Sequence, residues 1–132
     1  MAEPFKASLI TPEAIILETT IHSAQIPAFD GLLGVLNNRA PLLAKLSTGI
    51  LRLDTTSGGS QRYFVSGGYA QMKGQELTIL TTEAIPAANI TPQMIAGEQT
   101  KLNAVQGTDK QAMEQRTALQ ARVLTMRSLQ KA

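Results

Sequence analysis

The 132-residue chain contains no cysteine, no tryptophan and a single histidine, His22. Without cysteine it can form no disulfide framework, no thiolate metal site and no cysteine nucleophile, and such a composition is most natural in a reducing compartment. One histidine and scattered carboxylates supply no cluster of metal ligands. We therefore expect no metal site.

The chain also lacks a large excess of charge and any long apolar run. Twelve Lys and Arg face ten Asp and Glu, for a net charge of +2, whereas a nucleic-acid-binding surface needs a dense basic face. No apolar stretch approaches the roughly 20 residues that span a bilayer, and the first residues show no targeting peptide. We expect no nucleic-acid partner, membrane association only through another protein, and a cytoplasmic face by default.

Apolar residues make up 43% of the sequence, and the length suits one domain with a small appendage. Up to about Ala87 they form short runs, rich in β-branched residues and separated by turn signals. Such runs predict strands, the second of which Pro27 should close. The predicted strands are Phe5 to Ile10, Ala14 to Ile26, Leu42 to Leu46, Gly49 to Asp54, Gln61 to Val65, Tyr69 to Met72 and Glu76 to Thr81. Their spacing favours a β-sandwich or flattened barrel.

After Pro86 the composition becomes typical of helices, with much Ala, Gln, Met, Leu and Lys. Thr91-Pro92 predicts a helix start, with Thr at the N-cap and Pro at the first helical position. Gly107 suits the left-handed C-cap of this helix, and Asp109 suits the N-cap of a second helix that reaches Lys131. The sequence therefore predicts an α+β chain, with a β domain over residues 1–87 and an antiparallel two-helix hairpin over residues 88–132.

The second predicted helix has an apolar stripe and a set of basic residues beside it. The stripe contains Ala112, Leu119, Val123 and Met126, which fall within about 60° at 100° per residue. Arg116 and Arg127 lie within about 20° of each other beside the stripe, and Arg122 lies on its other flank. These arginines form either a solvated face, with the aliphatic parts of their side chains lying on apolar surface, or a contact for a partner.

No enzymatic motif stands out. His22 lies in a predicted strand near Thr20 and Ser23, where a half-exposed strand histidine is the ordinary interpretation. The glycines of Gly31-x-x-Gly34 and Gly67-Gly68 match no phosphate-binding loop and open no helix, so we expect no nucleotide or other cofactor. A glycosidase uses two carboxylates that flank the bond it cleaves, but the candidate carboxylates of this chain are scattered over different predicted turns and strands. They are Asp30, Asp54, Glu76 and Glu83.

The segment from Asp30 to Leu43 is predicted to be a surface loop, yet it is unusually rich in apolar residues. Either it folds back as a cap over one end of the sandwich, or its apolar residues form a docking patch for another protein.

Four motifs in this sequence resemble the epsilon subunit of F-type ATP synthases, equivalent to the mitochondrial delta subunit. They are Thr11-Pro12-Glu13, an Ile-Pro followed by a Gly-x-x-Gly-Val-Leu-x-x-x-Ala-Pro-Leu loop from Ile26 to Leu42, Gly49 to Arg52, and Val65 to Tyr69. They occur in the family's order and with its spacing, over nearly the whole N-terminal part.

The resemblance implies a ten-stranded β-sandwich followed by a C-terminal helical hairpin, in a non-catalytic subunit of the rotating central stalk. Such a subunit couples proton flow to ATP synthesis and restrains ATP hydrolysis. It implies that the sandwich binds the gamma subunit and the c-ring, and that the tail reaches the alpha and beta subunits. It also implies a peripheral location on the cytoplasmic face of the bacterial inner membrane, or alternatively on a thylakoid or mitochondrial inner membrane.

By the same resemblance, the residues expected to contact the c-ring and gamma are Asp30, Gly31, Leu32, Leu33, Arg39, Ala40 and Pro41. Arg116, Arg122 and Arg127 are expected to contact an acidic segment of the beta subunit. The chain departs from the family's pattern at Leu32, usually acidic, and at Arg39, usually histidine. The first helix also lacks the Asp-x-x-Arg-Ala motif with which some bacterial relatives bind ATP.

Two other function classes are compatible with the residues alone. One is a free-standing β-sandwich that binds a small ligand such as a sugar or lipid, although the chain has only five Phe and Tyr for stacking. The other is a small hydrolase that uses His22.

Overall fold

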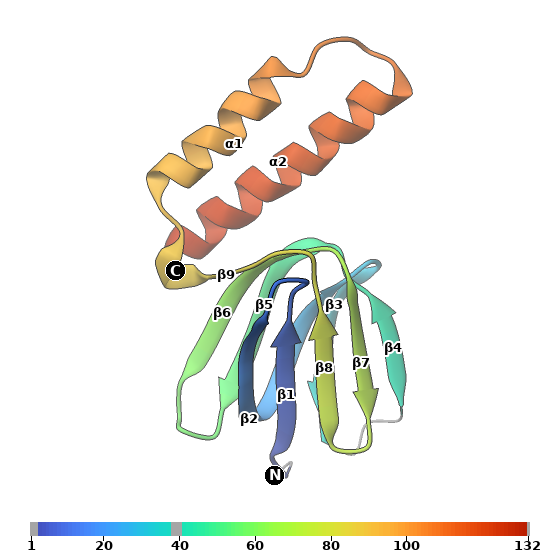
Figure 1. Cartoon of the computed structure of the whole chain (residues 1–132), viewed down its shortest axis with the longest axis vertical. Helices are drawn as coiled ribbons and strands as arrows, with labels where there is room; N and C mark the ends of the chain where they lie inside the picture. Colours follow the sequence, from blue (N-terminus) through green and yellow to red (C-terminus); the bar gives the residue numbers. More distant parts are fainter. Residues whose placement is uncertain (1–2, 38–40, 132) are drawn as a thin grey trace.

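The computed structural model describes residues 3–37 and 41–131, which form a β-sandwich followed by two helices (Figure 1). The strands are β1 (Phe5–Ile10), β2 (Ile15–Ala28), β3 (Gly31–Leu36), β4 (Leu42–Lys45), β5 (Thr48–Thr55), β6 (Ser60–Ser66), β7 (Tyr69–Lys73), β8 (Glu76–Leu80) and β9 (Ala84–Pro86). A 3-10 turn, η1 (Ala87–Asn89), leads to α1 (Pro92–Ala104) and α2 (Lys110–Lys131). The α+β class predicted from the sequence is confirmed.

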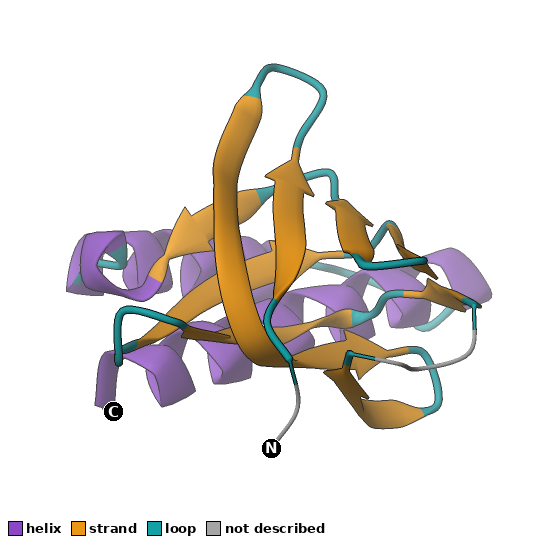
Figure 2. Cartoon of the chain, turned by 90° about the horizontal axis from the view of Figure 1, so that it is seen from below, coloured by secondary structure: helices purple, strands orange, loops and turns teal. Residues whose placement is uncertain are grey.

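The strands pair in the order β4-β7-β8-β1-β2-β5-β6-β9, and β3 adds to β2. β1 and β8 run parallel, whereas the other strand pairs are antiparallel. The 14-residue β2 pairs with β1 along its first half and with β3 and β5 along its second half, so it runs through both layers (Figure 2). The described residues contain nine strands, against the ten that the family resemblance implies.

Alternating side chains build the core between the layers. In β1, Phe5, Ala7 and Leu9 are buried while Lys6 is exposed, which is the period-two pattern of a strand with one dry face. Leu51 and Leu53 continue this core from β5. The sandwich has one continuous core of its own, separate from the residues beneath the helices.

The segment from Asp30 to Leu43, which the sequence predicts to be a loop, contains a strand instead. Residues Gly31 to Leu36 are β3 and pair with β2 from Ala28 back to Ser23. Pro27 does not close β2, because it stays paired with Leu32 and its carbonyl accepts a hydrogen bond from the Ser47 amide. Only Phe29 and Asp30 separate the two strands. The apolar residues are therefore explained by a β-hairpin, and the prediction of an irregular loop was wrong here.

Both helix starts agree with the predicted caps. The Met94 amide donates to Thr91 Oγ1 at 3.2 Å, and the Ala112 amide donates to Asp109 Oδ1 at 2.8 Å. The predicted end of the first helix was wrong. α1 stops at Ala104 and is capped by Val105 in an extended conformation, so Gly107, with φ +95°, lies beyond the cap in the connecting segment.

The helical hairpin lies at the end of the sandwich opposite the N-terminus (Figure 1). A second, smaller hydrophobic cluster joins the two parts, formed by Phe64, Ile90, Ile95, Val123, Met126 and Leu129. The predicted stripe of α2 faces inward, since Ala112, Val123 and Met126 are buried and Leu119 is half-buried. The hairpin is thus attached through this cluster rather than through the main core.

Candidate partner-binding surfaces

The turn between β2 and β3 and the neighbouring strand β4 carry a group of exposed apolar side chains. Phe29 is 72% exposed, Leu32 67% and Leu43 72%. We call these three residues the tip patch. Asp30 and Lys45 border the patch, and together they surround a shallow hollow of about 600 Å³. Three large apolar side chains left in water beside each other indicate a contact surface for another protein.

Two interactions hold the tip patch in place. The Phe29 amide donates to the Lys45 carbonyl at 2.8 Å, and Lys45 Nζ lies 5.2 Å from the centre of the Phe29 ring. Gly31 has φ +131°, a conformation that residues with a Cβ rarely adopt, and it permits the tight turn after Asp30. Phe29 and Leu32 are therefore presented on a hairpin that is fixed to β4, the strand that carries Leu43.

The structure brings four of the predicted contact residues, Asp30 to Leu33, to this turn. Asp30, Gly31 and Leu32 are exposed, whereas Leu33 packs against the core. Pro41 is exposed just before β4. Arg39 and Ala40 lie outside the described residues. The sequence analysis missed Phe29 and Lys45, although an aromatic residue directly before an Asp-Gly turn was a usable signal for the first.

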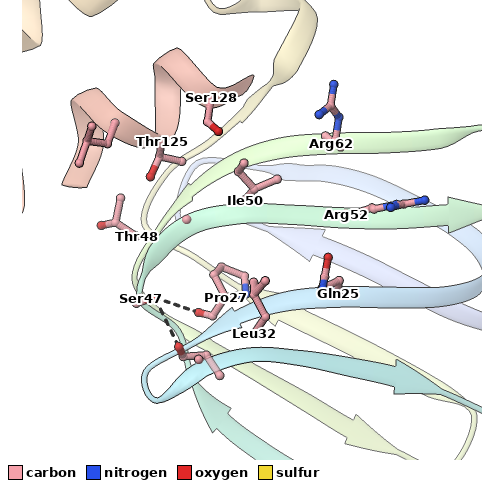
Figure 3. A pocket seen from close by; sticks show the side chains of 14 residues that line it. Gln25, Pro27, Leu32, Ser47, Thr48, Ile50, Arg52, Arg62, Thr125 and Ser128 are labelled. Atoms are coloured by element: carbon pink, nitrogen blue, oxygen red, sulfur yellow. Dashed lines mark hydrogen bonds between the residues drawn. The ribbon is translucent and has the colours of Figure 1, made fainter. Parts of the chain in front are cut away.

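A groove of about 570 Å³ lies between the sandwich and the C-terminal half of α2 (Figure 3). Leu32 and Ile50 line it from the strands, and Leu124 lines it from the helix. A Cβ on Gly49 would lie 2.5 Å from Cβ of Pro27, so the groove floor requires glycine there. The groove extends the apolar surface of the tip patch, through Leu32, as far as the hairpin.

Two paired arginines stand at one side of this groove. Arg52 and Arg62 face each other across β5 and β6, and like charges in this position repel. Arg52 Nε binds Asp54 Oδ1 at 3.0 Å. Hydrogen bonds from the hydroxyls of Ser23 and Ser60, followed by Arg52, hold the pKa of Asp54 below its usual value. The carboxylate thus offsets one of the two positive charges.

Arg122 on α2 binds groups from α1, from β6 and from the segment between β8 and β9. Its guanidinium donates to Glu83 at 2.9 and 3.3 Å, to Glu98 on α1 at 2.9 Å, and to the Ser66 hydroxyl at 3.4 Å. Its central carbon also lies 5.0 Å from the centre of the Phe64 ring, which is fully buried. Only 19% of the Arg122 side chain is exposed.

The charges in this network stabilise one another. The hydrogen bond from Arg122, reinforced by the charges of Arg122 and Lys101, lowers the pKa of Glu98 despite its burial. The bond to Glu98, followed by the bond to Glu83, raises the pKa of Arg122. Oε2 of Glu98 is buried without a hydrogen-bond partner. Arg122 is therefore engaged inside the chain, so the solvated-face alternative does not hold for it, and its expected contact with the beta subunit stays a prediction.

Arg116 and Arg127 make much weaker internal contacts. Arg116 donates to the Gly107 carbonyl at 3.1 Å, and Arg127 donates to Gln99 at 3.4 Å. Neither bond reaches the sandwich. These two cations thus remain accessible along the hairpin.

His22 is the residue on which the hydrolase alternative depends. His22 is exposed on β2, as the ordinary interpretation of a strand histidine expects. Among residues 3–37 and 41–131 no group of three or more His, Cys, Asp or Glu side chains could hold a metal ion. Neither helix of the described chain combines the length and the apolar character that crossing a membrane requires.

Residues 4–87 match the family model described as the ATP synthase delta/epsilon chain, beta-sandwich domain. The chain belongs to this family. It is 31% identical over 114 residues to the ATP synthase epsilon chain of Mesorhizobium japonicum, a match that covers 85% of this chain and 84% of the relative. It is 45% identical over 78 residues to the epsilon chain of Rhodopirellula baltica, covering 59% of this chain and 60% of the relative.

Mitochondrial proteins are also similar. The delta subunit of Pichia angusta ATP synthase is 39% identical over 83 residues, covering 61% of this chain and 52% of that protein. In solved structures, the fold is similar to a chain of Euglena gracilis mitochondrial ATP synthase with a TM-score of 0.83 and 23% identity, covering 95% of this chain and 80% of that one. A chain of the Tetrahymena thermophila central stalk and c-ring structure has a TM-score of 0.70 and 18% identity, covering 98% and 96%.

Membership of the delta/epsilon family makes the chain a non-catalytic, central-stalk subunit of an ATP synthase. This decides among the three function classes that the residues alone left open. The family match covers the sandwich, and the relative from Mesorhizobium extends the similarity into the helical hairpin.

Proposed function

We propose that the chain couples proton translocation to ATP synthesis by docking the c-ring and the gamma subunit through its sandwich, residues 1–87. The helical hairpin, residues 88–132, serves as a regulatory tail that contacts the alpha and beta subunits and restrains ATP hydrolysis. The chain belongs to the delta/epsilon family, and its most exposed apolar group lies at one end of the sandwich.

The observation that carries the docking proposal is the tip patch. Phe29, Leu32 and Leu43 together expose more apolar surface than an isolated surface residue does. Phe29 and Leu32 belong to the β2–β3 hairpin, which Lys45 fixes to β4, the strand that carries Leu43. Asp30, Gly31, Leu33, Arg39, Ala40 and Pro41 complete the proposed contact with the c-ring and gamma. Since the family usually has an acidic residue at position 32, Leu32 makes this contact more apolar than in related chains.

A charge at position 32 tests the docking proposal. Leu32→Glu places a carboxylate in the middle of the tip patch, and burying an unpaired charge is strongly unfavourable. We expect this variant to bind a reconstituted complex of gamma and c-ring at least about tenfold more weakly, as for the loss of a central interface residue. Met113→Glu, at an apolar position on α2 that is also exposed (56%, against 67% for Leu32), is the matched control and should bind like the unmodified chain.

Retained binding of Leu32→Glu, with its fold intact by circular dichroism, would place the c-ring contact elsewhere on the sandwich. Equal weakening by Met113→Glu would also count against the tip patch, because it would show a general effect of charge.

The proposed location is peripheral, on the cytoplasmic face of a bacterial inner membrane, where the chain is held by its partners. The related epsilon chains from bacteria support this location. The similarity to a mitochondrial delta subunit leaves the inner mitochondrial membrane, or a thylakoid membrane, as the alternative.

A further inference from the structure

The groove between the sandwich and α2 combines apolar walls with one basic side. Leu32 and Ile50 line it from the strands, and Leu124 lines it from α2. Arg52 and Arg62 lie together on one side of Ile50 (Figure 3). The volume of about 570 Å³ falls within the range of roughly 300–1,000 Å³ that is usual for small-molecule sites. The groove therefore suits a small ligand that has an apolar body and a negatively charged end.

Arg62 carries a charge that the protein itself does not offset. Its side chain is half-buried, and its guanidinium has no hydrogen-bond or ion-pair partner in the part of the chain that the structure describes. It faces Arg52 across β5 and β6, where two like charges are destabilising. Arg52 is bound by Asp54 at 3.0 Å and donates to Ser60 at 3.4 Å. The unbalanced charge is therefore that of Arg62, and a negative group from outside the chain would offset it.

We propose that the groove binds a fatty-acid carboxylate, whose head group pairs with Arg62 and whose acyl chain lies over Ile50 between Leu32 and Leu124. The planar guanidinium of arginine presents parallel donors that match the two oxygens of a carboxylate. The acyl chain covers apolar surface that the protein leaves in water, since Leu32 is 67% exposed and Leu124 65%. Removing such surface from water, on the ligand and on the protein, favours binding.

The local charge favours a carboxylate over a phosphate head group. Arg52 and Arg62 are the two charged residues among the described residues that line the groove, and Asp54 binds Arg52 beside it. Hydrogen bonds from Ser23 and Ser60, followed by Arg52, hold the pKa of Asp54 below its usual value, so this carboxylate is ionised at neutral pH. Two positive charges and one negative charge leave one positive charge, which a carboxylate balances. A phosphate monoester carries a charge of about −1.5 to −2 at pH 7, and Asp54 would repel the excess.

This ligand site does not depend on the partners proposed for the tip patch. Leu32 belongs to both surfaces, whereas Arg62, Ile50 and Leu124 line the groove and not the hollow at the tip patch. The test uses the isolated chain and changes none of the tip-patch residues. A failed ligand site would therefore leave the docking of the tip patch untouched, and failed docking would leave the ligand site untouched.

A titration of the isolated chain with octanoate, followed by methyl NMR, tests the site. Octanol keeps the alkyl chain without the charge, and octyl phosphate changes the head group. We expect octanoate to bind at least about tenfold more tightly than octanol, because a hydrogen bond between charged groups contributes about this factor, and more tightly than octyl phosphate. The methyl signals of Ile50 and Leu124 should shift on binding, whereas those of Leu43, which lies outside the groove, should not.

Arg62→Gln removes the proposed partner of the carboxylate. It should weaken octanoate binding at least about tenfold without lowering the melting temperature, because it breaks no side-chain bond within the described chain and relieves the repulsion from Arg52. Arg127→Gln is the matched control, since it removes the same charge from α2 at a position that does not line the groove, and it should bind octanoate like the unmodified chain. Leu124→Glu places a charge of the ligand's own sign in the exposed wall of the groove and should also weaken octanoate binding at least about tenfold.

Absence of saturable octanoate binding would overturn the proposal, as would equally tight binding of octanol. An unchanged affinity of Arg62→Gln, or an equal loss in Arg127→Gln, would show that Arg62 does not hold the head group. Shifts confined to Leu43 would place the ligand on the tip patch instead, and tighter binding of octyl phosphate than of octanoate would contradict the carboxylate head group.

Discussion

The ammonium group of Lys45 lies 5.2 Å from the centre of the Phe29 ring, and the Phe29 amide donates to the Lys45 carbonyl. These contacts fasten the β2–β3 turn to β4, a strand that lies at the far edge of the strand order from β9. Phe29 is nevertheless 72% exposed. The Phe29 ring is thus held in a fixed position but is not packed into the chain's own core. This is the arrangement expected of an aromatic residue that packs against a partner protein.

Phe29→Ala should weaken partner binding while changing the stability of the chain only slightly. The ring is mostly exposed, and a cation–π contact at such a site contributes about 0.5–1 kcal/mol, so the free energy of unfolding should fall by no more than about 1 kcal/mol. Binding to the gamma and c-ring complex should fall at least about tenfold, because exposed aromatic residues at contact centres dominate affinity. Urea denaturation and a binding titration check the two values. A large loss of stability with unchanged binding would show that Phe29 is structural.

Gly68→Ala should destabilise the sandwich strongly. Gly68 has φ +108°, and a Cβ there would lie 1.9 Å from the carbonyl oxygen of Leu80. Backbone strain of this kind contributes about 1–3 kcal/mol, and with the clash we expect a loss of roughly 2–4 kcal/mol. Gly34→Ala in β3, where nothing lies within 4 Å of the added Cβ, is the control and should lose much less. Thermal denaturation of the two variants measures the difference.

Acid should weaken the network around Glu98. Arg122, and Lys101 at 3.9 Å, lower the pKa of Glu98 from its ordinary value of 4.5, with Glu83 facing the same guanidinium. A group whose pKa is lower in the folded state adds stability above pH 4.5 that is lost as the pH falls through the folded value. The stability difference between the unmodified chain and Glu98→Gln should therefore shrink as the pH falls below about 4.5. Denaturation at several pH values checks this, and a pH-independent difference would contradict it.

Replacing Arg116, Arg122 and Arg127 by Ala should relieve the restraint on ATP hydrolysis without loosening assembly. The three cations are proposed to meet an acidic segment of the beta subunit. Arg122→Ala also removes the bonds to Ser66 and Glu83 of the sandwich, so Arg116→Ala with Arg127→Ala is the cleaner variant, since neither of these residues bonds to the sandwich. Hydrolysis by the reconstituted enzyme is the measurement. If the triple variant and the double variant both hydrolyse ATP at the rate of the unmodified enzyme, the three arginines do not form the regulatory contact.

Local patterns predicted much of this fold. The alternation in Phe5 to Ile10 and the caps at Thr91 and Asp109 depend on neighbouring residues, and the structure agrees with them. The strand over Gly31 to Leu36 was missed because its pairing partner is β2, whose predicted end at Pro27 hid the remaining pairs. Strand pairing depends on residues that are far apart in the sequence. Pro27 has no amide hydrogen to donate, but its carbonyl still accepts a hydrogen bond, so β2 continues through it.

The candidate contact residues, like the strands, could be predicted from the sequence only in part. Asp30 to Leu33 were predicted from the resemblance, and the structure places them at one turn, with Leu32 67% exposed. The position of Arg122 was not predictable from helix periodicity, because Glu83 and Glu98 approach it from segments 39 and 24 residues away. Ion pairs between distant segments depend on how the hairpin rests on the sandwich, which no local pattern contains.

The central claim is tested most directly by adding the chain to an ATP synthase depleted of its own epsilon subunit. We predict that the unmodified chain co-purifies with gamma and the c-ring and restores ATP-driven proton pumping, and that Leu32→Glu does neither, while Met113→Glu does both. Failure of the unmodified chain to bind gamma and the c-ring at low salt, or full activity of Leu32→Glu, would contradict the account.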